Sequence, residues 1–197
     1  MAYDDAILEF LAKPENLPVA LEVSRYLEKL KETLLEKFWV MFSERFVNLY
    51  KLSDYDQNWN AHSTVEGGSI KSYTKCGVIP LKASQCETPL LGVFLENNIK
   101  SSGYRFYRGV WWTDSNPTYD PIAYRDLQSK LNSLGLTNSD SRWAGYHYLG
   151  FYALGEKFLF RMGNDPQDFV KEVVQQTWDL FVELEPILSG FNQQLLE

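Results

Sequence analysis

Residues 17–51 read LPVALEVSRYLEKLKETLLEKFWVMFSERFVNLYK, and this stretch decides the fold. Asn16 fits the position of a helix cap, and Pro18 fits the first turn of the helix that follows. Apolar residues then recur every three or four positions: Val23, Leu27, Leu30, Leu34, Phe38, Met41, Phe42, Phe46 and Leu49. The pattern predicts one helix, which at ~1.5 Å per residue is about 50 Å long. Because a domain of this size cannot cover such a helix, it either bends over a sheet or presents an apolar seam to a partner.

The rest of the chain predicts a sheet and a second long helix. Strand-like runs lie at 62–66, 77–82, 91–96, 104–112, 143–148 and 158–162, with a helix predicted at 121–134. Asp165 and Pro166 fit the start of the last helix, which Pro186 kinks or ends. Since most connections are too short for helical crossovers, we expect an antiparallel β-meander. The predicted fold is a single α+β domain over 1–197: a helical arm and long helix at 1–51, a sheet with one inserted helix at 60–162, and an amphipathic helix at 165–190.

Composition limits the classes of function. The chain has 197 residues, of which 45% are apolar and 23% charged, as in ordinary globular proteins. Aromatic residues reach 15%, which favours a core of large side chains and leaves an aromatic binding surface as the alternative. The formal net charge of −7 disfavours nucleic acid, because phosphate binding requires Lys and Arg. The residues that suggest a basic patch are Lys100, Arg105, Arg108 and Arg125.

The compartment is predicted from the first residues and from the cysteines. Residues 1–5 are acidic and carry no basic segment of a signal peptide, so we expect a cytoplasmic protein. Cys76 and Cys86 match no zinc pattern, and free thiols are expected, with a hairpin disulfide as the alternative. No apolar run approaches the roughly 20 residues of a membrane span, so no membrane association is predicted.

Motifs that carry chemistry are missing from the sequence. His62 and His147 are the two histidines, and neither lies in a metal-ligating pattern. Nucleophile elbows and phosphate-binding glycine loops are absent as well. The sequence therefore predicts no cofactor and no metal site, and it favours a protein that is not an enzyme. For a divergent metal-dependent nuclease, the candidate acids are Glu66, Glu96 and Asp114, but no strand carries an acid two residues before a lysine.

Several segments together resemble a known family. They are residues 37–42 (KFWVMF) on a helix, a strand that ends in Trp111-Trp112, residues 142–149 (RWAGYHYL), and a final amphipathic helix. This order resembles the C-terminal region of bacterial proteins of the PD-(D/E)XK nuclease superfamily, from about residue 30 onward. In that group a nuclease domain precedes a region of this pattern. Here the acid–x–Lys signature is not found, so no catalytic residue carries over. The resemblance implies an accessory part that binds another macromolecule.

The main hypothesis is a non-catalytic macromolecule-binding protein that acts as a regulator, inhibitor or accessory subunit, in a bacterial or phage defence setting. Its partner would be another protein or a second copy of the chain, bound through the long helix or through aromatic side chains, which are favoured at interfaces. The predicted contact residues are Tyr104, Arg105, Tyr107, Arg108, Trp111 and Trp112. Two alternatives stay open: the divergent nuclease, and a nucleic-acid-binding module in which the same arginines and tryptophans hold phosphates and bases.

Overall fold

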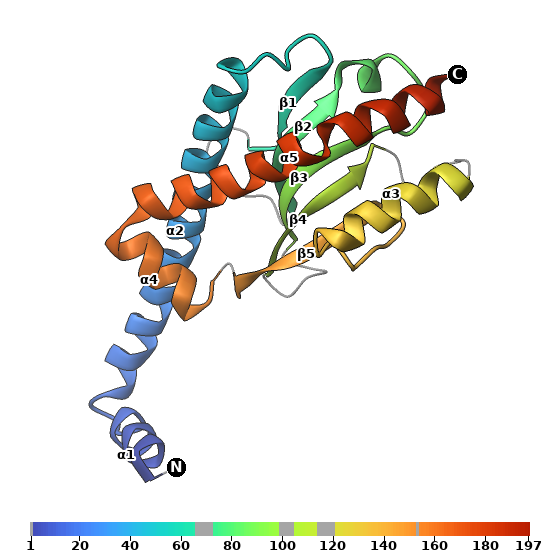
Figure 1. Cartoon of the computed structure of the whole chain (residues 1–197). Helices are drawn as coiled ribbons and strands as arrows, with labels where there is room; N and C mark the ends of the chain where they lie inside the picture. The colour runs from blue at the N-terminus through green and yellow to red at the C-terminus, as the bar shows by residue number, and fades with distance from the viewer. Residues whose placement is uncertain (1, 66–72, 99–104, 114–120, 153) are drawn as a thin grey trace.

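The computed structural model describes residues 2–65, 73–98, 105–113, 121–152 and 154–197. Figure 1 shows a sheet covered by helices, with a helical arm that runs away from it. In chain order the elements are α1 (Ala2–Leu11), α2 (Leu17–Lys51), β1 (Trp59–Ser63), β2 (Tyr73–Pro80), a 3-10 turn (Leu81–Ser84), β3 (Leu91–Asn98), β4 (Arg105–Trp112), α3 (Pro121–Ser133), β5 (Trp143–Tyr152), α4 (Glu156–Asn164) and α5 (Pro166–Leu196).

The strands form an antiparallel meander, as the sequence predicts. Their order is β1-β2-β3-β4-β5, and every neighbouring pair is antiparallel. Val78, Val93 and Val110 lie opposite one another across three strands. Because side chains alternate between the two faces of a strand, this register also decides which aromatic residues enter the core. The α+β class and the framing by a long N-terminal and a C-terminal helix are confirmed.

Only the second half of α2 packs on the sheet. Its buried side chains are Leu35, Phe38, Trp39, Phe42, Phe46 and Tyr50. Residues 21–30, in the first half, are all exposed. The same apolar repeat is therefore exposed to solvent in the first half of α2 and packed against the core in the second half.

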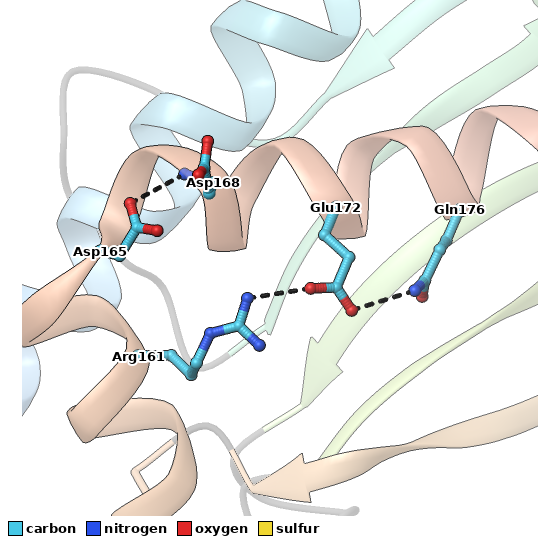
Figure 2. A network of polar contacts seen from close by, with 5 residues as sticks. All are labelled: Arg161, Asp165, Asp168, Glu172 and Gln176. Atoms are coloured by element: carbon cyan, nitrogen blue, oxygen red, sulfur yellow. Dashed lines mark hydrogen bonds and ion pairs between the residues drawn. The ribbon is translucent and has the colours of Figure 1, made fainter.

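Helix α5 crosses the same face of the sheet and continues further than expected. The side chain of Asp165 accepts a hydrogen bond of 3.3 Å from the backbone N–H of Asp168, which caps the helix start (Figure 2). Pro186 lies inside the helix and does not end it. A proline removes the hydrogen bond to the carbonyl four residues earlier. The carbonyl that loses this bond belongs to Val182, a residue that is 40% exposed.

The predicted strand at 158–162 is wrong, because these residues belong to α4. Phe158 and Met162 are the buried residues of this helix, four positions apart. A spacing of four places both side chains on the face that meets the core. The apolar run Phe158-Leu159-Phe160 is too short to separate a strand from a helix by its period.

Most aromatic side chains fill one core between the helices and the sheet. There the rings of Phe38 of α2 and Phe158 of α4 contact each other, and both contact Phe106 of β4 and Phe169 of α5. Leu127 and Leu131 of α3 belong to the same cluster. The opposite face of the sheet carries a smaller cluster, in which Phe94, Tyr107 and Trp143 are buried. Strand residues alone form this second cluster within the described ranges, and we call its side of the sheet the helix-free face.

Candidate interaction surfaces

Strand β4 divides the predicted contact residues between the two faces of the sheet. Trp112 is 2% exposed within the main core, so it cannot contact a partner, and that part of the prediction is corrected. Tyr107 is buried and Trp111 half-buried on the helix-free face. The guanidinium of Arg105 lies 4.9 Å from the ring centre of Tyr148. Tyr104 lies outside the described residues. The pleat thus separates side chains that are neighbours in sequence.

Arg108 lies on the helix-covered face and is engaged there. Its Nε donates a hydrogen bond of 3.1 Å to Nε2 of His147 on β5, and its Nη1 donates one of 3.1 Å to Gln176 on α5. Burial lowers the pKa of His147, and the positive charge of Arg108 lowers it further. His147 is therefore a neutral acceptor that helps to hold α5 against β5. Gln176 also donates to Glu172, which pairs with Arg161 of α4 (Figure 2).

In a variant with glutamine in place of His147, the free energy of unfolding is expected to fall less at acid pH than it does in the unmodified protein. Folding lowers the pKa of His147 below its ordinary value of 6.5, so the native state binds fewer protons than the unfolded state. The free energy of unfolding therefore falls as the pH decreases below that value. Glutamine can still accept from Arg108 but does not titrate. Urea unfolding at about pH 7.5 and 5.5 measures the effect. Equal losses of unfolding free energy in both proteins would contradict this role for His147.

A polar cluster lies buried on the helix-free face. Lys75, Glu96 and Tyr107 face one another on β2, β3 and β4, with Glu96 opposite both partners in the register. Tyr107 donates a hydrogen bond to the Glu96 carboxylate. Nζ of Lys75 lies 3.2 Å from the ring centre of Trp111 and 4.7 Å from that of Phe94. Burial lowers the pKa of Lys75 to about 8, and the negative charge of Glu96 opposes this shift.

The polar cluster is a closed structural feature and not an open cleft. Glu96 is 1% exposed, and Lys75 and Tyr107 are buried as well. Removing one partner of a buried charge pair is costly, so such a cluster favours a single strand register. Lys75 is not among the predicted residues, because the nuclease pattern has the acid and the lysine on one strand, whereas Lys75 and Glu96 lie on two. Lys75 also precedes the run predicted as a strand at 77–82, so alternation along that run could not place it beside Glu96.

Of the candidate acids for metal-dependent chemistry, Glu96 alone lies within the described ranges. Glu96 belongs to the polar cluster, and Glu66 and Asp114 lie outside the described residues. Within the described ranges, no three His, Cys, Asp or Glu side chains gather as metal ligands would. Both cysteines are free. Burial raises the pKa of Cys76 to about 12, which keeps its thiol protonated and unreactive.

A hollow lies between the end of α5 and the start of the sheet. Its volume is about 560 Å³, and Trp59, Lys82, Asn192 and Gln193 are among the residues that line it. The buried polar groups at its wall are already bonded: Trp59 donates to Glu185, and Asn192 bonds the backbone of Leu91. The hollow therefore shows no group that is held ready for a ligand.

The arm, which we define as residues 2–34, presents an extended apolar surface. Large hydrophobic side chains on both of its helices are exposed. Five of those on α2 form one stripe, because residues three, four and seven apart lie on the same side of a helix. We call this set the arm stripe: Val19, Val23, Tyr26, Leu27 and Leu30. Among the described helices, none combines the length and the hydropathy that crossing a membrane requires.

Comparisons with protein-family models, with curated proteins and with solved structures find no match to this chain. The resemblance to the accessory region of PD-(D/E)XK proteins stays a prediction. Function must be inferred from the surfaces themselves, and within the described ranges the arm stripe is an apolar surface without a role in the core.

Proposed function

We propose that this chain is a non-catalytic protein-binding protein, a regulator, inhibitor or accessory subunit that docks through the arm stripe. The observation that carries the proposal is the exposure of apolar side chains along a continuous face of α2, with Leu27 45% and Leu30 52% exposed. A contiguous apolar patch beyond roughly 300–600 Å² is unusual on a monomer and marks an interaction site. The matching partner surface is an apolar helix face, since helices bind helices through residues spaced three and four apart.

The described residues give less support to the two alternatives. A nuclease would need carboxylates that converge on a metal ion. Glu96 instead accepts a hydrogen bond from Tyr107 inside the sheet. A nucleic-acid-binding module would need arginines and aromatic rings on one open surface. Arg108 is bonded to His147 and Gln176 beneath α5, and Trp112 is a core residue.

A photo-crosslinking pair of variants tests the proposal in the native host. The photoreactive residue p-benzoylphenylalanine replaces Leu27 in the arm stripe or, as the matched control, Leu21 on the other side of the same helix. Both positions are exposed leucines, so the two variants differ mainly in which face of α2 carries the photoreactive residue. We expect a defined protein adduct from position 27 and little from position 21. Absence of an adduct at 27, or equal labelling at both positions, would refute the proposal.

A further inference from the structure

Helix α1 is amphipathic, and its apolar face is open to solvent. Ile7, Phe10 and Leu11 share one face, because residues three and four apart lie on the same side of a helix. Their exposed fractions are 42%, 57% and 38%. With 10 residues, α1 is shorter than the roughly 12–15 residues that an isolated helix needs in water. Its helical state therefore needs an apolar surface on which this face can pack.

The connection between α1 and α2 allows α1 to reach the arm stripe. Residues 12–16 join the two helices. Antiparallel helix pairs are joined by loops of about two to five residues, so this connection is long enough for α1 to turn back along α2. At ~1.5 Å per residue, α1 is about 15 Å long and would extend from Leu17 to about Tyr26. It would then cover the arm stripe at Val19, Val23 and Tyr26.

The corner between the helices holds α1 away from the arm stripe in this structure. Figure 1 shows α1 beyond the start of α2, at the free end of the arm. Nδ2 of Asn16 donates a hydrogen bond of 2.8 Å to the carbonyl of Phe10, and the same side chain does not cap α2. The backbone N–H groups of Asn16 and Leu17 donate to the carbonyl of Lys13. These groups lie at or near the surface, so water can replace their partners when the corner rearranges.

The charges of both helices are compatible with a contact between their apolar faces. At 3.6 residues per turn, Asp5 and Glu9 lie on the side of α1 opposite its apolar face, and Asp4 lies at the edge of that face. On α2, Glu22 borders the arm stripe and lies 3.6 Å from Arg25, which offsets its charge. The acids of α1 therefore stay in water when the two faces meet, and the contact buries no unpaired charge.

We propose, on the basis of the function proposed above, that α1 is a lid for the arm stripe. In the closed form its apolar face packs on Val19, Val23 and Tyr26, and in Figure 1 the lid is open. Both α1 and the proposed partner offer an apolar helix face, so the two compete for one site. The partner then binds only open molecules, and its apparent affinity is reduced by the fraction of molecules that are closed.

Disulfide exchange with glutathione measures the closure of the lid in the purified full-length chain. One variant carries Ile7→Cys and Val23→Cys, and the matched control carries Ile7→Cys and Leu21→Cys. In the closed form Leu21 lies level with Ile7 but on the other side of α2 from the arm stripe. Both variants also carry Cys86→Ser, whereas Cys76 is retained because its buried thiol is unreactive.

We expect the thiols at 7 and 23 to have an effective concentration at least about tenfold above that of the control pair, because a disulfide needs Cβ atoms within about 4.5 Å. Equal effective concentrations in the two pairs would overturn the lid. Circular dichroism of the reduced proteins checks that both variants stay folded, which is expected because the substituted residues lie outside the core.

Locking the lid separates this inference from the proposed function. The cysteine pair at 7 and 23 is combined with p-benzoylphenylalanine at 27, and the oxidised and reduced proteins are irradiated in extract of the native host. We expect oxidation to lower the protein adduct from 27 at least about fivefold, since closed molecules cannot bind the partner. Ile7→Cys alone cannot form the lock and should give equal adduct under both conditions.

The outcomes of the two experiments are distinguishable. An adduct from 27 that is the same in the oxidised and reduced pair overturns the lid, while the proposed function stands. Preferred disulfide formation at 7 and 23 without an adduct in either form refutes the proposed function, whereas closure of α1 over the arm stripe is then confirmed by the disulfide alone. Neither preference nor adduct refutes both.

Discussion

Replacing Phe38 with alanine is expected to lower the free energy of unfolding by about 3–5 kcal/mol, the range for a large aromatic residue in a packed core. Phe38 is fully buried and contacts rings from α2 itself, β4, α4 and α5. Its ring centre lies 4.9 Å from that of Phe106 and 5.8 Å from that of Phe169. Because these partners come from four elements that are rigidly packed, the cavity can collapse only in part.

Urea unfolding followed by circular dichroism measures this change, and Phe38→Leu provides the graded control. Leucine keeps most of the apolar volume, so the loss should be well below that of alanine. Leu30→Ala is the positional control: it removes a large side chain from the same helix, but from the exposed arm. It should change the stability of the folded monomer by less than about 0.5 kcal/mol. A loss below about 1 kcal/mol in Phe38→Ala would show that Phe38 does not hold the helices to the sheet.

The pattern of residues 17–51 could predict the long helix but not the point at which it leaves the core. Leu27 and Leu30 belong to the same repeat of apolar residues every three or four positions as Phe38 and Phe42, yet the first pair is exposed and the second buried. Local periodicity reports that a helix has an apolar face and says nothing about how far the sheet beneath it extends. That extent depends on the positions of β1 to β5, which are set by contacts distant in sequence.

The contact residues of β4 were less predictable than the strand itself. Alternation correctly separates Arg105, Tyr107 and Trp111 from Arg108 and Trp112. Because each set contains an arginine and aromatic residues, the sequence does not reveal which face the helices cover. The polar cluster was missed for a related reason. Lys75 and Glu96 are 21 positions apart in sequence and meet only through the β2–β3 register.

Replacing Asn192 with leucine is expected to cost about 2–5 kcal/mol, because two buried backbone groups would each lose a hydrogen bond. Asn192 is 5% exposed, accepts a bond of 2.8 Å from the N–H of Leu91 and donates one of 3.0 Å to its carbonyl. Among the described strand residues, the β2–β3 pairing ends at Val78 opposite Val93. The same register carried two residues further would bring Pro80 opposite Leu91, and a proline has no N–H to donate. Asn192 thus takes the place of a strand partner.

This role gives a physical reason for the length of α5. A helix that ended at Pro186 would leave the N–H and the carbonyl of Leu91 without these two bonds in the core, whereas the turns beyond the proline carry Asn192 to them. Gln193→Leu is the matched control: it makes the same amide-to-leucine change at the next, exposed position and should alter stability by less than about 0.5 kcal/mol. Hydrogen exchange at the Leu91 amide should speed up in Asn192→Leu and not in Gln193→Leu. Unchanged protection of that amide would mean that the asparagine bonds do not anchor the end of α5 to the sheet.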